Sequence, residues 1–280
     1  MTVGIVSPGH MGSGLGFSLA RGGERVVATV AGRSARTARL ARDLELLPDL
    51  DAVVTASDVL LVVTPPAEAV AAAAEIAAAA QRTGARPLVV DMNAVSPVTL
   101  TAVQSELGGL DLVDGSISGG PPSVADGTQL YFSGPRVGEV LALPWTGVVP
   151  LALGDEVGTA SALKMCTASV YKGMAALWAQ AMVTAEHHGV LDAFLADVGR
   201  NVPKKPSDVA RAATKAHRYV GEMHEIAATQ SGAGLSPALF AAIAAIWRDI
   251  AAGPLAQGDP ESVDGTMPAS EIVAGLLPGR

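Results

Sequence analysis

Short runs of β-branched and aliphatic residues alternate with helical stretches through the first half of the chain, and this alternation constrains the fold more than any other feature. Such alternation builds right-handed strand–helix–strand crossovers, and therefore a parallel sheet with helices on both faces. We expect strands at about 3–6, 25–30, 52–55, 59–63, 87–91 and 110–116, with helices at about 11–21, 34–46, 67–82 and 97–107. Two later runs, 128–134 and 147–154, are expected to extend the sheet.

The pattern changes after Gly158, where only helical periodicity remains. The stretch from 159 to 190 has no proline and one internal glycine, and Gly189 is placed as a helix C-cap. Further helices are expected at 191–199, 206–229, 236–252 and 268–277. The sequence therefore predicts two domains, an α/β domain over 1–155 and an all-α domain over 156–280 that begins with a long interdomain helix.

The composition narrows the class of protein. Hydrophobic residues make up 49% of the chain and charged residues 16%, which is typical of a well-packed globular protein. The net charge of −8, without a long basic cluster, indicates no nucleic-acid partner. The N-terminus lacks a basic signal-peptide segment, and the most apolar window carries glutamates, so we expect no membrane span. The single cysteine, Cys166, favours a reducing cytoplasmic location, and no residue spacing indicates a metal site.

A glycine-rich turn follows the first strand in VGIVSPGHMGSGLG, residues 3–16. Its spacing places Gly9 where a backbone approaches a dinucleotide pyrophosphate and Gly12 where the helix packs closely on the strand. The helix start, with His10 and Met11, offers unpaired N–H groups to the phosphates. Ser7 replaces the first glycine of the usual fingerprint. We favour a cofactor site, and a purely structural turn is the alternative.

The residues after the second strand indicate which dinucleotide is preferred. Enzymes that bind NAD usually place an acidic residue there for the ribose 2′-hydroxyl, but this chain has none between Glu24 and Asp43. Arg33, Ser34 and Arg36 occupy the region instead. Guanidinium and hydroxyl groups suit a 2′-phosphate, so NADP(H) is the expected cofactor. The alternative is that these residues are solvated and simply open a surface helix.

Polar and turn residues follow the later strands, and ligands of open parallel sheets gather at the carboxyl ends of the strands. We expect Thr64, Pro65 and Asn93 to contact the cofactor, whereas Asp91 suits a turn role and Ser96 a helix cap. After the sixth strand, Ser118, Gly119 and Gly120 could cradle a substrate carboxylate or a developing oxyanion. Turn formation alone would also explain the two glycines.

One lysine stands out in the long helix. Lys164 is the only charged residue between Glu156 and Lys172, and burial would suit it to proton transfer. Tyr171 follows seven residues later on the same face and is a second candidate. From spacing alone, however, a lone lysine of this kind is more often a surface residue whose stem covers apolar neighbours.

These motifs in this order resemble the β-hydroxyacid dehydrogenase superfamily, which includes 6-phosphogluconate and 3-hydroxyisobutyrate dehydrogenases. The matching segments are GIVSPGHMG, GRS, DMNAVSP, DGSISGGPP and the glycine–lysine spacing from Gly158 to Lys164, while KAHRYVGEMHEIA is similar to a subgroup with a phosphogluconate-dehydrogenase-like C-terminal domain. The resemblance implies a Rossmann domain followed by a helical, dimer-forming domain. It also implies that Lys164 is the general acid or base, with Ser118, Gly119 and Gly120 as the substrate loop. By the same resemblance Gly9, Met11 and Gly12 form the pyrophosphate turn, and Arg33 and Ser34 select NADP.

The chain departs from that family at position 168, where Ala168 replaces an asparagine that contacts substrate. This departure argues against a simple 3-hydroxy acid. The expected function is hydride transfer between NADP(H) and a small, acidic carbonyl or hydroxy compound, by a homodimer formed through the helical domain. Imine reductases share the architecture but typically replace the lysine. Imine reduction and a non-catalytic NADPH-binding role are the alternatives.

Overall fold

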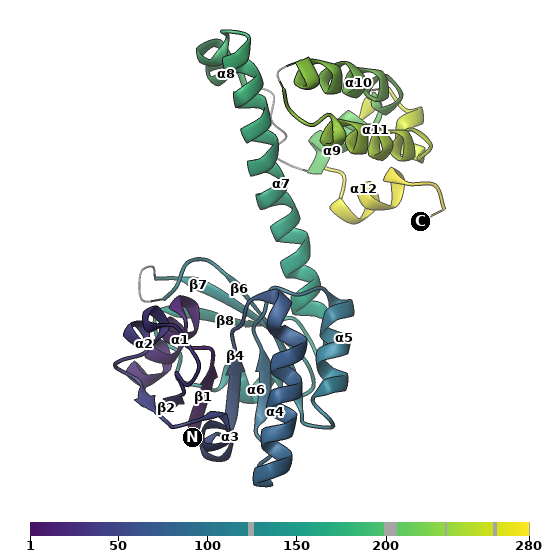
Figure 1. Cartoon of the computed structure of the whole chain (residues 1–280). Coiled ribbons are helices and arrows are strands. Elements are labelled where there is room, and N and C mark those ends of the chain that lie inside the picture. Colours follow the sequence, from purple (N-terminus) through teal and green to yellow (C-terminus); the bar gives the residue numbers. More distant parts are fainter. Residues whose placement is uncertain (123–125, 199–205, 233, 260–261, 280) are drawn as a thin grey trace. The chain divides into compact units, whose positions relative to one another are not determined.

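The computed structural model describes the whole chain except residues 123–125, 199–205, 233, 260–261 and 280 (Figure 1). The chain forms two compact units, Met1–Tyr171 and Lys172–Arg280. The division lies within helix α7 (Thr159–His187), so the first turns of this helix belong to the N-terminal unit.

The N-terminal unit is built on an eight-stranded sheet in the order β3-β2-β1-β4-β5-β6-β7-β8. Strands β1 to β6 run parallel, β7 is antiparallel to β6, and β8 is parallel to β7. The first six strands have the order of a dinucleotide-binding Rossmann fold, which confirms the predicted class. The strands are β1 (Thr2–Val6), β2 (Arg25–Ala28), β3 (Glu45–Leu46), β4 (Val59–Val62), β5 (Leu88–Asp91), β6 (Leu112–Ser118), β7 (Thr128–Ser133) and β8 (Val148–Ala152).

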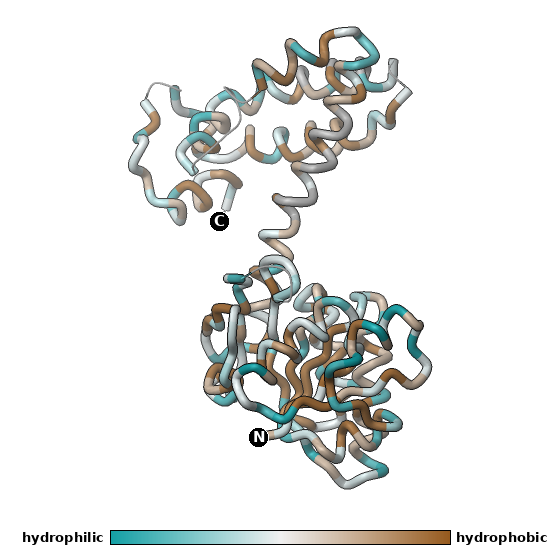
Figure 2. The backbone as a smooth tube through the Cα atoms, turned by 90° about the vertical axis from the view of Figure 1, so that its left-hand side faces the viewer, coloured by the Kyte–Doolittle hydropathy of each residue, from teal (hydrophilic) through white to brown (hydrophobic). Residues whose placement is uncertain are grey.

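Helices cover both faces of this sheet, because alternate strand residues point to opposite sides. On one face, Ile5 and Leu61 pack with Leu15 of α1 (His10–Arg21) and Val140 of α6 (Val137–Leu141). The other face is covered by α3 (Leu50–Ala56), α4 (Ala69–Thr83) and α5 (Pro97–Glu106). Figure 2 shows the strands as the most hydrophobic part of this unit. The predicted cap is confirmed, since Ser96 accepts a hydrogen bond from Thr99 N with Pro97 in the first helical turn.

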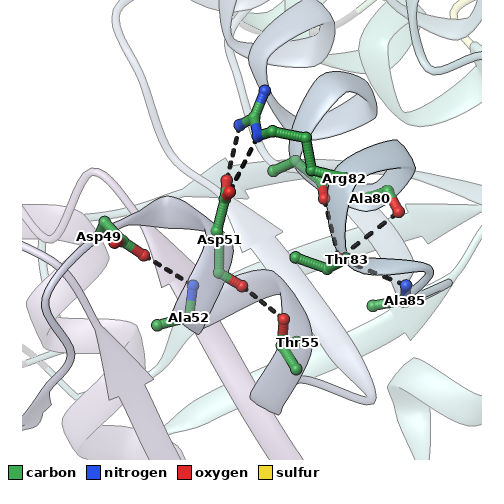
Figure 3. A network of polar contacts seen from close by, with 9 residues as sticks. Asp49, Asp51, Ala52, Thr55, Ala80, Arg82, Thr83 and Ala85 are labelled. Atoms are coloured by element: carbon green, nitrogen blue, oxygen red, sulfur yellow. Dashed lines mark hydrogen bonds and ion pairs between the residues drawn. The ribbon is translucent and has the colours of Figure 1, made fainter.

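The prediction of a strand at 52–55 is wrong, because this segment lies in helix α3. Asp49 caps the helix by accepting a hydrogen bond from Ala52 N at 2.8 Å. Arg82, at the end of α4, forms two hydrogen bonds to the Asp51 carboxylate (Figure 3). The valines at 53 and 54 are β-branched, but they are buried as the inner face of a short amphipathic helix. The cap and the packing outweigh their strand propensity.

Two other helices are shorter than predicted. The helix expected over 34–46 is α2 (Ala35–Leu40), and β3 follows it, pairing Glu45 with Val27 of β2. The helix expected over 206–229 divides into α9 (Pro206–Ala213) and α10 (Ala216–Gly232). At the break, Thr214 Oγ1 donates to Arg211 O and Lys215 N donates to Ala212 O. Neither the segment after α2 nor the break between α9 and α10 contains a glycine or proline, so periodicity alone does not reveal where these helices end.

The C-terminal unit is helical. It contains the remainder of α7, then α8 (Leu191–Val198), α9, α10, α11 (Ala238–Ala251), the short 3-10 segment η2 (Pro254–Gln257) and α12 (Ala269–Leu276). Helices α10 and α11 pack together through Tyr219 and Trp247, whose rings lie edge to face with their centroids 5.0 Å apart. Within the described part of the chain, no helix combines the length and apolarity that a membrane crossing requires.

Candidate cofactor and active site

The glycine-rich turn between β1 and α1 has the backbone that the missing glycine would provide. Ser7 has a φ of +65°, and among the described non-glycine residues it alone has a positive φ. This left-handed conformation costs an L-residue about 1–2 kcal/mol. Gly9 N donates to Ser7 O at 2.7 Å, and Ser13 Oγ donates to Pro8 O at 2.6 Å, so both hydrogen bonds hold the turn closed. Ser7 therefore takes, at the tight-turn position, a left-handed backbone conformation that usually favours glycine.

The two retained glycines have different local environments. A Cβ built on Gly12 would lie 2.6 Å from the backbone oxygen of Ser7, so the turn and α1 approach too closely for any side chain. A Cβ built on Gly9 would meet no atom within 4 Å. Gly9 is the residue before the first turn of α1, where backbone N–H groups have no partner within the helix. An open surface beside these donors fits a dinucleotide pyrophosphate, with exposed His10 and half-buried Met11 next to it.

The loop after β2 presents exposed cationic side chains. Arg33, Ser34 and Arg36 are all exposed, and Ser34 caps α2 by accepting a hydrogen bond from Thr37 N. Arg25 pairs with Glu45. In the described residues, by contrast, neither Arg33 nor Arg36 forms an ion pair. The loop thus combines a helix-opening serine with two guanidinium groups that form no ion pair among the described residues, the chemistry expected for a phosphate contact.

The ends of β4 and β5 are joined by buried polar groups. Asn93 Oδ1 accepts hydrogen bonds from Thr64 N at 2.6 Å and Thr64 Oγ1 at 3.2 Å, while Asn93 Nδ2 donates to Asp91 at 2.9 Å. Asn93 is only 2% exposed, so its amide is already committed to these contacts. Asp91 Oδ1 also accepts from Asn93 N, which is the turn role expected for it. Pro65 is exposed beside them at the start of η1 (Pro66–Glu68).

The carboxyl group of Asp91 is 1% exposed and lies at the end of β5, in register with Asp114 of β6. Burial raises the pKa of Asp91 from its ordinary value of 3.8 to about 6, although the two hydrogen bonds from Asn93 act in the opposite direction. The nearby Asp114 carboxylate contributes further to the rise in pKa. The sheet edge therefore carries a buried carboxyl group that is more costly to ionise than one in water.

The Ser118–Gly119–Gly120 loop begins where β6 ends. Ser118 and Gly119 are exposed, and Gly119 has a φ of +134°. A Cβ on Gly119 would lie 2.9 Å from Thr128 Oγ1, so the neighbouring strand β7 requires glycine here. Thr128 Oγ1 also donates to Gly120 O at 2.6 Å. The loop is thus a fixed bend whose serine faces solvent.

Lys164 lies in the second turn of α7 and reaches this loop. Its Nζ donates to Ile117 O at 2.5 Å, and Ile117 directly precedes Ser118. The side chain is half-buried, so the solvated surface lysine expected as the alternative does not describe it fully. Ala168 is half-buried one turn later. Tyr171 lies on α7, but its side chain is outside the described part of the structure.

The sheet topology brings these elements to one edge. Strands β2, β1, β4, β5 and β6 are consecutive parallel neighbours, so the segments that follow them all emerge at the carboxyl edge. These segments contain the Ser7 turn, the Arg33 loop, Thr64, Asn93 and Ser118. Over the described residues, no cluster of three or more His, Cys, Asp or Glu side chains could hold a metal ion.

One buried carboxyl group at this edge is not among the residues predicted from the sequence. Asp114 is fully buried in β6 and accepts four hydrogen bonds, from Ser133 and from the start of α7. The available signal was an acidic residue among the aliphatic and small residues of the strand LVDGSIS. Such a residue implies buried partners, since an isolated carboxylate is costly to bury.

Comparison with known proteins identifies the family. Residues 2–139 match the NAD binding domain of 6-phosphogluconate dehydrogenase. These residues therefore form an NAD-binding domain of this dehydrogenase family. Residues 185–250, in the helical unit, match a second family model, the domain of unknown function DUF1932. The resemblance inferred from the ordered motifs is thereby confirmed.

Two individual proteins resemble the chain over most of its length. An uncharacterized 28.5 kDa protein of Methanothermus fervidus is 26% identical over 215 residues, which are 75% of this chain and 81% of the relative. A conserved protein of unknown function, described as structurally similar to 3-hydroxyacid dehydrogenases, superposes with a TM-score of 0.59 at 24% identity, covering 89% of this chain and 97% of that one.

Imine reductases share the fold of this chain. The imine reductase from Myxococcus stipitatus in complex with NADP+ has a TM-score of 0.66 at 18% identity, covering 89% of this chain and 93% of its own. A variant of that enzyme in complex with NAD+ has a TM-score of 0.69 at 18% identity, with coverages of 92% and 96%. At these identities the likeness concerns the fold.

Proposed function

We propose that the protein is an NADP(H)-dependent oxidoreductase that acts on a small carbonyl or hydroxy compound carrying an acidic group. The observation that carries the proposal is the contact between Lys164 Nζ and Ile117 O. It fixes an ammonium group beside the Ser118 loop, at the sheet edge where an NAD-binding domain holds its nucleotide. A proton donor at this edge supports hydride transfer coupled to proton transfer on a bound substrate.

Each group at this edge has a defined task. When bound, the cofactor supplies or takes the hydride at its nicotinamide ring. Lys164 gives a proton to the substrate oxygen during reduction and takes it back during oxidation. The Ser118 hydroxyl and the backbone of Gly119 and Gly120 hold the acidic group of the substrate, which orients the reacting carbon. Tyr171 is the second candidate for proton transfer.

The preference for NADP(H) rests on charge. No acidic residue follows β2 to bind a ribose hydroxyl, and a 2′-phosphate would find the exposed guanidinium groups of Arg33 and Arg36 together with the Ser34 hydroxyl. Arginine forms two charge-assisted hydrogen bonds to a phosphate, whereas a neutral ribose hydroxyl gains much less from it.

The proposed assembly is a homodimer formed through α7. By helical spacing Val170, Met174 and Leu177 share one side of this helix, and their exposed fractions are 61%, 42% and 36%. A second copy of the chain would cover this apolar stripe. Sedimentation of the wild type and of a Met174→Glu variant tests the assembly, with a dimer expected for the first and a monomer for the second.

The catalytic proposal is tested with two replacements of one side chain. Lys164→Met keeps the length and packing of the side chain without its charge, and Lys164→Arg keeps the charge on a group that does not release its proton. Both variants should lose about 10²-fold or more in turnover while binding NADPH as the wild type does. Near-normal turnover in either variant contradicts proton transfer by Lys164.

Imine reduction is the second candidate, because imine reductases share the fold of this chain. An iminium substrate already carries its proton, so turnover of a cyclic imine panel should depend little on Lys164. Screening carbonyl, hydroxy-acid and imine panels with NADPH separates the two reactions. Tight NADPH binding without turnover of any panel would instead indicate a non-catalytic binding protein.

A further inference from the structure

The carboxyl group of Asp114 holds the start of α7 against the sheet. Its Oδ2 accepts hydrogen bonds from Gly158 N at 3.0 Å and Ser161 N at 2.9 Å, and its Oδ1 accepts one from Ser161 Oγ at 2.7 Å. Asp114 is fully buried, so these bonds are made without competition from water. A carboxylate also interacts favourably with the positive end of the helix dipole.

A second side chain completes this contact. Ser133 of β7 donates to Asp114 Oδ2 at 3.2 Å and accepts a hydrogen bond from Ala160 N at 3.1 Å. Three backbone N–H groups at the start of α7 therefore find partners on two strands of the sheet. Such groups have no partner within a helix and usually bind a local cap or water. We name Asp114, Ser133 and Ser161 the α7 clamp.

The clamp lies one helical turn from Lys164. Ser161 and Lys164 are three residues apart on α7, and their partners Asp114 and Ile117 are three residues apart on β6. The helix thus contacts the strand at two successive points in the same order. A shift or rotation of α7 that breaks the first contact must also move the ammonium group away from the Ser118 loop.

We propose that Asp114, acting through Ser133 and Ser161, is a positioning residue that sets the location of the Lys164 ammonium group relative to the Ser118–Gly119–Gly120 loop. This inference rests on the proposed function of Lys164. Displacement of a catalytic group by about 1 Å can cost about 10²-fold in rate, so the clamp contributes to catalysis without touching substrate.

The test compares three variants. Ser161→Ala removes one bond from the clamp, and Asp114→Asn leaves a single acceptor oxygen for the donors of α7. The control is Ser57→Ala, which loses a buried serine bond of similar length, 2.6 Å to Val53 O, in the same unit but at the end of α3. All three variants should be less stable than the wild type. Only the two clamp variants should lose turnover, by about 10-fold for Ser161→Ala and by more for Asp114→Asn. The Kd for NADPH should be unchanged in all three.

Two further readouts separate positioning from stability alone. The rate at which an amine-acylating reagent labels Lys164, followed by mass spectrometry, should change several-fold in the clamp variants and stay at the wild-type value in Ser57→Ala. In a Lys164→Met background, Ser161→Ala should have no further effect on turnover. Wild-type labelling and wild-type turnover in both clamp variants would overturn the proposal. Altered labelling with turnover that never depends on Lys164 would instead overturn the proposed function and leave the positioning intact.

Discussion

Gly9→Ala should separate cofactor binding from folding. In the structure an added Cβ at Gly9 meets no atom within 4 Å, and the φ of −70° suits alanine. The cost to stability is therefore limited to a poorer helix N-cap, about 1 kcal/mol or less. The same methyl group would occupy the space that we assign to the pyrophosphate. If it removes one charge-assisted hydrogen bond, worth about 1.5–3 kcal/mol, NADPH affinity falls about 10- to 150-fold.

Thermal or denaturant unfolding measures both effects in one experiment. At an NADPH concentration 100 times the wild-type Kd, the ligand should stabilise the wild type by about 2.7 kcal/mol. The same concentration should stabilise Gly9→Ala by only about 0.3–1.4 kcal/mol, which follows from the expected affinities. Gly138→Ala is the matched control, because its Cβ also meets no atom within 4 Å but lies in α6. This control should keep the full stabilisation by NADPH.

The outcome that would refute this reasoning is a wild-type response of Gly9→Ala to NADPH. The turn would then be structural, and the cofactor would bind elsewhere. Gly12→Ala gives the complementary case, because its Cβ would lie 2.6 Å from Ser7 O. Such a close contact costs about 1–3 kcal/mol, less about 1 kcal/mol gained from helix propensity, and it should weaken NADPH binding by moving the turn.

Three further predictions concern the same sheet edge. Arg33→Ala should weaken NADPH binding about 10-fold or more and leave NADH binding unchanged, and equal losses measured by titration would contradict a phosphate contact. Ser7→Val should lower the free energy of unfolding by about 1–2 kcal/mol while Ser7→Gly does not, because a β-branched residue is poorly accommodated at a φ of +65°. Because the pKa of Asp91 is raised from 3.8 to about 6, its contribution to stability is full below pH 4 and is lost as the pH rises through 6. At 1.36 kcal/mol per pKa unit, the wild type should lose about 3 kcal/mol of unfolding free energy between pH 4 and 7.5. The unfolding free energy of Asp91→Asn should therefore rise by about 3 kcal/mol relative to that of the wild type over this range. A difference between the two proteins that does not change with pH would contradict the assignment.

Most of the residues that lie at the carboxyl edge of the sheet can be predicted from local sequence. Each parallel strand is a short apolar run, and the polar residue that ends it must lie at the carboxyl edge, as Thr64, Asn93 and Ser118 do. The position of Ser7 in the glycine spacing locates the tight turn, although it does not reveal the positive φ. The apolar neighbours of Lys164 and the family resemblance both indicate this residue as a candidate for proton transfer. Its contact with Ile117 O joins residues 47 positions apart and needed the structure.

Other features depend on contacts that sequence periodicity does not encode. The valines at 53 and 54 suit a strand by propensity, and only the Asp49 cap and the packing of α3 make them helical. The two-residue strand β3 exists because its backbone pairs with β2. The amide of Asn93 suggested a ligand contact, but it is occupied by Thr64 and Asp91. Asp114 gave no local sign of its partners in α7.

The measurement that tests the central claim most directly is hydride transfer followed by an isotope label. NADPH deuterated at the transferred position of the nicotinamide ring is incubated with the protein and a panel of small keto acids and aldehydes, and the products are analysed by mass spectrometry. The account predicts that deuterium appears in the hydroxy product formed by the wild type and is reduced about 10²-fold with Lys164→Met, although that variant still binds NADPH. No label from any substrate, or equal labelling by Lys164→Met, would contradict it.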